Sequence, residues 1–326
     1  MGRGHGHDLD DLDRDRPCAG SQSGVQAKEI LQKKGSLGNK ISGPNPGLAH
    51  SYVTVNGVRL HTVSTGRAAG KKLLLLIHGF PELWYSWRYQ LQAFCDDFEV
   101  LAFDLRGYGD SDRPQGLEHY TMDKLVGDVV GLVKELGYKS ACLMGHDWGG
   151  NIAWHVAAVH PEVVERLVIC CSPHPSAYNE NMDSDQRNRF WYMLLFQGPK
   201  VPELYFSHTD FAQLAAMFMH GGKMGMQRAD AFTMDDLERA MSAPIRTPTL
   251  ILWGDSDAFM GKQLLRGIEK HVVDVSVHML HKCSHWAQQD RPMEVNAAVQ
   301  EFLTEKAGVV TSIAAPVSEH AATTWH

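Results

Sequence analysis

The hexapeptide at residues 145–150, Gly-His-Asp-Trp-Gly-Gly, constrains the fold more than any other part of the chain. It follows a strand-like run at 140–144 and precedes a helix-like run at 151–160, and glycines lie two residues before and after Asp147. Only small residues fit beside a side chain that projects from so tight a turn between a strand and a helix. The motif therefore predicts a nucleophile elbow, in which the central residue is presented for attack.

Asp147 at the centre of this turn limits the kinds of carbon atom that the nucleophile can attack. A serine would have to lose a proton before attacking and suits acyl carbons, whereas a carboxylate, with a pKa of about 4, is ionised at pH 7 and suits displacement at an sp3 carbon. The product would be an alkyl ester of the enzyme, which water must then open. Because an aspartate that precedes a helix is commonly an N-cap, that structural role is the alternative.

The rest of the chain alternates between apolar strand-like runs and amphipathic helix-like runs. An opening hairpin is expected at 52–55 and 58–64, joined by Asn56-Gly57, which is a favoured hairpin turn. Further strands are expected at 73–77, 99–103, 141–144, 167–171, 249–253 and 273–280, with helices that include 122–136, 151–158 and 293–305. This alternation predicts an α/β fold, a mostly parallel sheet flanked by helices, with the functional site at the carboxyl ends of the strands.

Changes in composition divide the chain into five segments. Residues 1–48 are rich in Gly, Asp, Lys, Ser and Pro and are expected to form a disordered leader, and 307–326 a flexible tail. The α/β core is expected in two parts, 49–171 and 246–306. Between them, residues 172–245 lose the strand rhythm and become rich in Trp, Tyr, Phe and Met. They are expected to form a helical lid that lines an apolar pocket.

Composition also excludes several classes of partner. The 326 residues carry 31 Lys and Arg against 38 Asp and Glu, a formal net charge of −7, so nucleic acid is not an expected partner. The six cysteines lack Cys-x-x-Cys spacing, which favours buried free thiols in a reducing compartment. No apolar run approaches the roughly 18 residues of a membrane helix, and no secretory signal is evident, so a cytoplasmic location is expected. The oligomeric state is not predicted.

No cofactor or metal is expected. The run at 66–72 is one residue short of a P-loop and precedes a strand instead of following one. The glycines at 107 and 109 lack the third glycine of a dinucleotide fingerprint. The segment 104–109 is expected instead to form a turn held by side-chain hydrogen bonds.

Two later segments supply partners for Asp147. Asp255 and Asp257 follow the expected strand at 249–253, and His285 follows the last expected strand. A neutral histidine can take a proton from the water that attacks an ester, and an aspartate can orient that histidine and stabilise its cation. On the residues alone, either aspartate can fill this role. The order nucleophile, acid, histidine is the chain order of α/β-hydrolases.

The tetrahedral oxyanion that forms during ester hydrolysis needs hydrogen-bond donors. The expected pair is the backbone N–H of Trp148, directly after the nucleophile, and that of Phe80, in the loop after the expected strand 73–77.

Taken together, these motifs resemble the epoxide hydrolase branch of the α/β-hydrolases, most closely the animal epoxide hydrolase 3 and 4 type. The resemblance covers residues 50–305 and is carried by His-Gly-Phe-Pro at 78–81, Ser-Trp-Arg at 86–88, Asp-Leu-Arg-Gly-Tyr-Gly at 104–109, the elbow at 145–150, Trp-Gly-Asp-Ser-Asp at 253–257 and Ser-His-Trp at 284–286. It implies that a small apolar epoxide and water are the substrates and that a vicinal diol is the product. The nucleophile, acid and histidine of the family correspond to Asp147, Asp257 and His285, which favours Asp257 over Asp255.

That family also uses two lid tyrosines to hydrogen-bond the epoxide oxygen and to protonate it as the ring opens. Tyr192, in Trp-Tyr-Met-Leu-Leu-Phe-Gln at 191–197, resembles the first of them. The second lies in a Pro-x-x-Tyr-Arg-like stretch of the family and has no counterpart here, because 234–238 runs almost at once into 245–248. The lid is therefore expected to be shortened, and Tyr205 is the alternative donor within it.

Two other functions are compatible with the same residues. A haloalkane dehalogenase shares the aspartate, acid and histidine, but that family usually has Asn where this chain has Phe80. A protein that keeps the fold and turns over slowly or not at all would be consistent with the shortened lid. The presence of all three residues of the triad favours an active epoxide hydrolase.

Overall fold

The computed structural model describes residues 47–65, 70–190, 201–208, 241 and 243–304. The expected leader lies outside these residues except for its last two positions, and so do the expected tail and most of the expected lid, including Tyr192. The described residues all belong to the second of two compact units, which spans residues 44–326. None of the helices described is long and apolar enough to cross a membrane.

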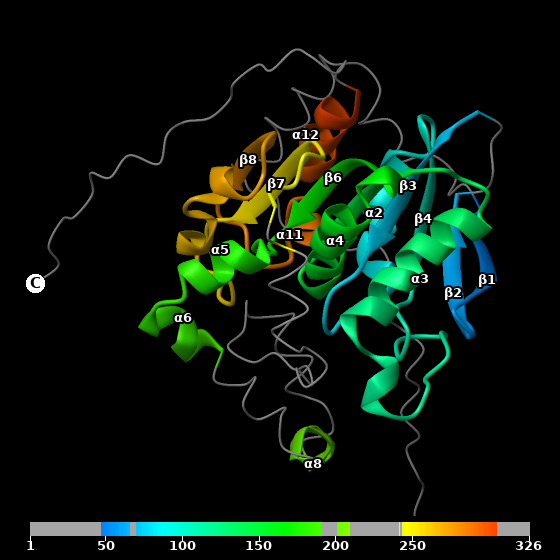
Figure 1. The fold of residues 1–326 in the computed structure, drawn as a ribbon, viewed down its shortest axis with the longest axis horizontal. Helices are drawn as coiled ribbons and strands as arrows, with labels where there is room; N and C mark the ends of the chain where they lie inside the picture. Colours follow the sequence, from blue (N-terminus) through cyan, green and yellow to red (C-terminus); the bar gives the residue numbers. More distant parts are fainter. Residues whose placement is uncertain (1–46, 66–69, 191–200, 209–240, 242, 305–326) are drawn as a thin grey trace, which may run out of the picture. The chain divides into compact units, whose positions relative to one another are not determined.

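An eight-stranded sheet forms the centre of the fold, in the order β1-β2-β4-β3-β5-β6-β7-β8 (Figure 1). The strands are β1 Ala49–Val55, β2 Val58–Ser64, β3 Lys72–Ile77, β4 Phe98–Phe103, β5 Ala141–His146, β6 Val164–Cys170, β7 Thr249–Gly254 and β8 Val275–Leu280. The pairs β1–β2 and β2–β4 are antiparallel, and the other neighbouring pairs are parallel. The predicted α/β fold, with its opening hairpin and mostly parallel sheet, is confirmed.

Helices cover both faces of this sheet (Figure 1). Helices α3 Met122–Glu135 and α4 Trp148–Val159 pack on one face, and α2 Arg88–Ala93, α11 Ala287–Asp290 and α12 Pro292–Thr304 lie on the other. Along β3, Leu73 and Leu75 join the apolar cluster with α3 and α4, whereas Leu74 and Leu76 join the cluster with α2 and α12. Because successive side chains of a strand point to opposite faces, a strand covered on both sides becomes a continuous apolar run.

The expected elements differ from the observed ones mainly at their ends. β8 begins at Val275, two residues later than expected, since Val273 is 63% exposed and lies outside the ladder. α4 begins at Trp148, three residues earlier than expected, because the elbow passes directly into the helix. Both errors arise where tertiary contacts, and not local sequence pattern, decide the boundary.

The described residues between 172 and 245 contain helices α5 Pro175–Glu180, α6 Ser184–Arg189 and α8 Val201–His208. α6 is well capped, because the carboxylate of Asp183 accepts the N–H of Gln186 at 2.8 Å. Arg187 and Arg189 lie in its last turn, where positive charge is favourable. Most residues of the shortened lid expected from the sequence lie outside those that the structure describes, so this lid stays a prediction.

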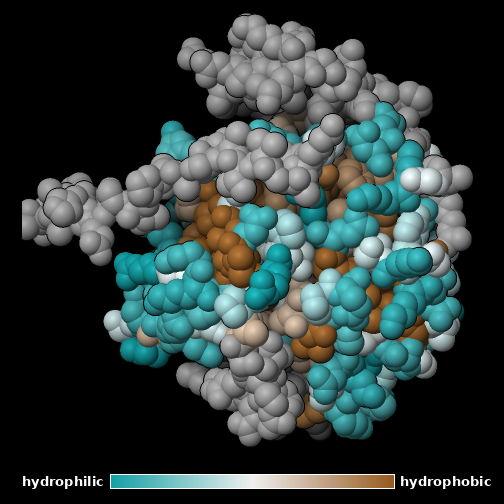
Figure 2. Space-filling model, turned by 45° about the horizontal axis from the view of Figure 1, so that its top comes forward, coloured by the Kyte–Doolittle hydropathy of each residue, from teal (hydrophilic) through white to brown (hydrophobic). Residues whose placement is uncertain are grey.

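The molecular surface gives no single dominant apolar area on the face drawn in Figure 2, where hydrophobic side chains form separate patches among hydrophilic ones. The exposed large apolar residues come from different elements, among them Tyr52 of β1, Tyr85 of the 3-10 turn Trp84–Trp87, and Val273 before β8. Scattered exposures of this kind are normal for protein surfaces.

Candidate active site

Asp147 lies on the elbow between β5 and α4, with φ of 51° and ψ of −119°. A positive φ is uncommon for a residue with a side chain, and sparsely populated conformations of this kind cost about 1–3 kcal/mol. Asp147 holds the N-cap position of α4, yet its side chain makes no capping hydrogen bond. The N-cap role therefore does not account for an aspartate here, and its carboxylate is turned to other partners.

Backbone crowding explains the glycines around the elbow. A Cβ atom on Gly145 would lie 2.5 Å from the carbonyl oxygen of Gly149, and one on Gly79 would lie 2.5 Å from the Cβ of Asp147. Ser172 fixes the turn from behind, because its Oγ donates to the carbonyl oxygen of Asp147 at 2.7 Å. Ser172 was not predicted from the sequence, since a lone serine after a strand carries no distinguishing pattern.

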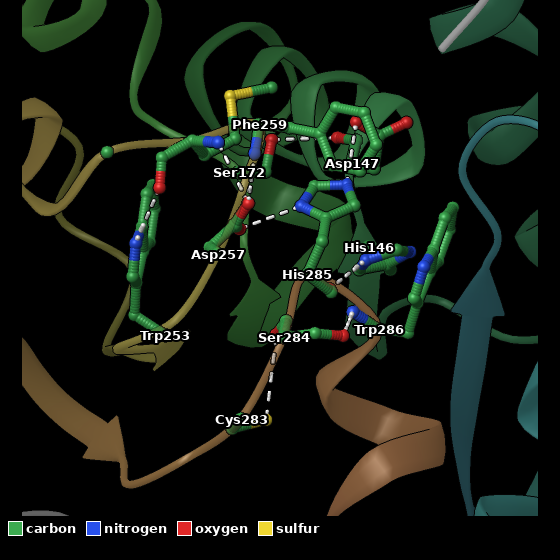
Figure 3. Close-up of polar contacts among 12 residues, drawn as sticks. His146, Asp147, Ser172, Trp253, Asp257, Phe259, Cys283, Ser284, His285 and Trp286 are labelled. Atoms are coloured by element: carbon green, nitrogen blue, oxygen red, sulfur yellow. Dashed lines mark hydrogen bonds and ion pairs between the residues drawn. The ribbon is translucent and has the colours of Figure 1, made fainter. Parts of the chain in front are cut away.

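Asp147, Asp257 and His285 meet at the carboxyl ends of β5, β7 and β8 (Figure 3). The imidazole of His285 lies between the two carboxylates, with Nδ1 2.8 Å from Oδ2 of Asp257 and Nε2 3.3 Å from Oδ2 of Asp147. All three residues are buried. The structure thus brings together the three residues that the sequence singled out.

Asp257, and not Asp255, faces His285. Its Oδ1 accepts the backbone N–H groups of Phe259 and Met260, both at 2.8 Å, which leaves Oδ2 for the histidine. Asp255 instead lies 2.7 Å from Nδ1 of His281, a side chain that is 80% exposed. The alternative acid therefore belongs to the surface.

The two carboxylates control the charge of the histidine. Burial alone would lower the pKa of His285, but the charge of Asp257 and the hydrogen bonds to Asp147 and Asp257 outweigh burial and raise this pKa to about 10. Burial would likewise raise the pKa of Asp147, yet the hydrogen bond to His285 and its charge prevail and lower it. Both shifts have the direction that favours a protonated His285 between two carboxylates.

Of the two expected oxyanion donors, Phe80 is aimed at the nucleophile. Its backbone N–H donates to Oδ1 of Asp147 at 2.9 Å, and the Phe80-Pro81 peptide bond is cis. Trp148 is the first residue of α4, and the N-terminus of a helix attracts negative charge. The role of its N–H as second donor stays a prediction.

A second pair of histidine and carboxylate lies behind the first and was not predicted. Nδ1 of His146 lies 2.6 Å from Oε2 of Glu82, and Nε2 lies 2.8 Å from the carbonyl oxygen of His285. Glu82 also accepts the N–H of Gly79 at 2.9 Å. Burial would raise the pKa of Glu82, but the charge and hydrogen bond of His146 outweigh it and lower the pKa. The only signal in the sequence was an acid one residue after the motif at 78–81.

One cysteine lies close to the triad. Ligating atoms of Cys171, Asp257 and His285 all lie within 4.8 Å of one another, a spacing that a metal ion could bridge. However, burial raises the pKa of the Cys171 thiol well above its usual range, and the oxygens of Asp257 already accept hydrogen bonds. A neutral thiol is a poor metal ligand. This donor set fits a histidine held by its acid better than it fits a metal centre.

Asp104, the acid that opens the segment 104–109, has a structural role. Oδ1 of Asp104 accepts the N–H of Trp84 at 2.9 Å, and Oδ2 accepts that of Asp110 at 3.2 Å. Asp104 also lies 2.8 Å from Nδ1 of His61. The predicted turn held by side-chain hydrogen bonds is confirmed.

Comparison with known proteins places this geometry in a family. A family model described as the alpha/beta hydrolase fold matches residues 72–201. Epoxide hydrolase 2 of Caenorhabditis elegans is 37% identical over 286 residues, which cover 78% of this chain and 80% of that protein. Epoxide hydrolase 4 of Homo sapiens is 38% identical over 298 residues, 82% of each chain.

A solved structure gives the same result. The epoxide hydrolase of Bacillus megaterium in complex with an inhibitor matches with a TM-score of 0.70 and 33% identity, covering 78% of this chain and 100% of that chain. With relatives of this similarity along most of their length, and with the elbow, acid and histidine in place, the chain belongs to the epoxide hydrolase family of the α/β-hydrolase fold, a family of hydrolase enzymes.

Proposed function

We propose that this protein hydrolyses small apolar epoxides to vicinal diols through an ester formed on Asp147. The observation that carries the proposal is that the two oxygens of this carboxylate have different partners. Oδ1 accepts the N–H of Phe80 at 2.9 Å, and Oδ2 faces His285 at 3.3 Å. The relatives named as epoxide hydrolases support the class of substrate.

In the first step, Oδ2 of Asp147 attacks a ring carbon and the bond from that carbon to the epoxide oxygen breaks. Oδ1, held by Phe80, becomes the carbonyl oxygen of the ester. The epoxide oxygen leaves as an alkoxide and takes a proton, for which Tyr192 is the proposed donor. A general acid typically contributes about 10²- to 10⁴-fold to such a step.

Alkylation then changes the state of His285. The ester carries no negative charge, so one of the carboxylates that raise the pKa of His285 is gone and this pKa falls. Tyr192, having given its proton to the alkoxide, takes up the proton that His285 releases, so the number of protons in the site is conserved. The neutral imidazole, oriented by Asp257, is now a base.

In the second step, His285 takes a proton from water while the water oxygen adds to the ester carbonyl. The oxyanion forms at Oδ1, where Phe80 and, in this proposal, Trp148 donate to it. Collapse breaks the bond between the carbonyl carbon and the ester oxygen, and this oxygen takes the proton of the newly added hydroxyl. The diol leaves with an oxygen that came from Asp147. The carboxylate and the imidazolium are restored.

Isotope labelling in a single turnover tests this pathway. With enzyme in excess over an aromatic epoxide in H₂¹⁸O, the first diol should contain no label, and the label should enter Asp147. Asp147→Asn should give no diol. Label in the first diol would show direct attack of water on the epoxide and contradict the ester mechanism. A chloroalkane of the same skeleton, tested in parallel, should release no chloride if the haloalkane alternative is wrong.

A further inference from the structure

The loop that carries the acid, residues 257–261, is held by side chains from outside it. Nη1 of Arg189 donates to the carbonyl oxygen of Asp257 at 3.0 Å, and Nε1 of Trp253 donates to that of Met260 at 3.3 Å. Gln186 makes two such contacts: Nε2 donates to the carbonyl oxygen of Phe259 at 2.6 Å, and Oε1 accepts the N–H of Gly261 at 2.9 Å. Gln186 and Arg189 both come from α6.

Gln186 is the central contact in this set. Its side chain is fully buried, and both of its polar atoms are used by the loop. A buried amide that satisfies a carbonyl and an N–H two residues apart fixes the backbone between them, and loss of either bond leaves a buried polar group unpaired, which is destabilising. The residue so fixed is Met260, whose N–H donates to Asp257.

The same loop touches the histidine. The ring of Phe259 lies edge-on to that of His285, with centroids 5.0 Å apart, and its N–H donates to Oδ1 of Asp257 (Figure 3). Gln186 therefore acts on both partners of the acid–histidine pair through Phe259. It touches none of the groups proposed to react, so its effect is indirect.

We propose that Gln186 is a positioning residue that couples α6, at the start of the expected lid, to the step of ester hydrolysis. This inference rests on the proposed function. Ring opening depends chiefly on Asp147, which α6 does not hold in the contacts described, whereas water activation depends on the alignment of Asp257 and His285. Tyr192, the proposed acid for ring opening, follows α6 by only three residues in the sequence. Residues 184–192 thus include both Tyr192, the proposed proton donor of ring opening, and the α6 side chains that hold the loop of Asp257.

Gln186→Met tests the proposal, because it keeps the length of the side chain and removes both hydrogen bonds to the loop. It also removes the longer bond that Oε1 accepts from Nε2 of Gln263 at 3.3 Å. Misplacement of a catalytic group by about 1 Å can cost about 10²-fold, so a loosened loop should slow ester hydrolysis by about 10-fold or more. Ring opening should change by less. Intact-mass spectrometry of quenched steady-state mixtures should then show a larger fraction of alkylated enzyme than in wild type.

Thr249→Val is the matched control, since it removes one buried hydrogen bond, from Oγ1 to the carbonyl oxygen of Thr247, at the opposite end of β7. It should lower stability without accumulation of ester. Equal slowing of both steps in Gln186→Met, no slowing of either, or the same accumulation in Thr249→Val would overturn the inference.

Gln186→Glu keeps the test usable if the methionine variant does not fold. A protonated carboxyl can still donate to Phe259 and accept from Gly261, whereas an ionised one is repelled by the Phe259 carbonyl. The charged groups that contact Gln186 or the loop that it holds include Asp183, which accepts the backbone N–H of Gln186, and Arg189, which donates to the carbonyl oxygen of Asp257. The pair Asp257 and His285 completes this set. Relative to wild type at each pH, hydrolysis should be close to normal at pH 5 and fall as the pH rises to 8. A ratio independent of pH would contradict the role of the two hydrogen bonds.

Failure of the proposed function gives a different result. If the first diol formed by wild type in H₂¹⁸O contains label, then the ester mechanism is wrong. If the ester is seen in His285→Gln but Gln186→Met behaves as wild type, only the positioning role is wrong.

Discussion

Two pairs of histidine and carboxylate lie back to back in this site, with the rings of His146 and His285 only 4.8 Å apart between centroids. Each Nδ1 faces a buried carboxylate, that of Glu82 at 2.6 Å and that of Asp257 at 2.8 Å. The pairs differ in what the other ring nitrogen faces. Nε2 of His285 faces the carboxylate of Asp147, and Nε2 of His146 faces the carbonyl oxygen of His285.

This difference concerns the charge of the partner during the proposed reaction. Asp147, the partner of His285, loses its negative charge in the proposed reaction, and this loss lowers the pKa of His285 and favours release of the proton on Nε2. The partner of His146 is a backbone carbonyl, which accepts a hydrogen bond and never changes charge. Since both nitrogens of His146 face acceptors, this pair is suited to fix the loop at 78–82 and the backbone of His285 throughout the cycle.

The largest effect should follow from replacing His285, the histidine whose partner changes charge in the proposed reaction. His285→Gln should still be alkylated at Asp147 but should fail to open the ester, because an amide cannot take the proton from water. The value of kcat should fall by about 10⁴-fold or more, as removal of a catalytic histidine does in other covalent mechanisms. Intact-mass spectrometry after mixing with an aromatic epoxide should show a stable adduct.

The control for this variant is His281→Gln, because His281 and Asp255 form a similar pair at 2.7 Å on the surface. Its activity should equal that of wild type. An unmodified His285→Gln protein would mean that the histidine acts before the ester forms, and the two pairs would then not differ in the way inferred.

The two pairs also differed in how far the sequence predicted them: Asp257 and His285 were predicted, and Glu82 and His146 were not. Asp147 and His285 follow strands in an order that reports their chemistry, with Asp255 or Asp257 as the acid between them, and the resemblance to epoxide hydrolases then favoured Asp257. The alternation of strand-like and helix-like runs made the fold predictable. Glu82 lies in an irregular loop, and its partners His146, Gln288 and Gln289 are 64 to 207 residues away. Gln186 is likewise a polar residue within a helix, and only the packing of α6 against the acid loop gives it a role. Such contacts are set by topology and not by local pattern.

A smaller effect on the rate should come from replacing Tyr192. The size of this effect shows whether Tyr192 or His285 protonates the epoxide oxygen during ring opening. Tyr192→Phe should slow alkylation by about 10²-fold if the phenol protonates the leaving oxygen. Tyr205→Phe is the matched control and should have little effect. Pre-steady-state alkylation rates on a trans-epoxide decide the matter. A rate for Tyr192→Phe within a few-fold of wild type would point to the imidazolium of His285, or to another donor, as the acid.

The smallest effect is the dependence of stability on pH, where the two pairs should act at opposite ends of the scale. The pKa of His285 is raised from 6.5 to about 10, so its contribution is complete below pH 6.5 and is lost as the pH rises through 10. The pKa of Glu82 is lowered from 4.5, so its contribution is present above pH 4.5 and is lost as the pH falls further.

Urea unfolding of two variants across pH 3 to 10 separates these contributions. Glu82→Gln should cost about 3 kcal/mol near pH 7, as loss of a buried ionic partner does, and this cost should shrink as the pH falls below 4.5 through the lowered pKa of Glu82. Asp147→Asn should move the alkaline loss of stability to lower pH, because His285 then has one carboxylate fewer. If Glu82→Gln changed the alkaline limb as much as the acid limb, the two pairs would contribute to stability as one coupled unit and not separately.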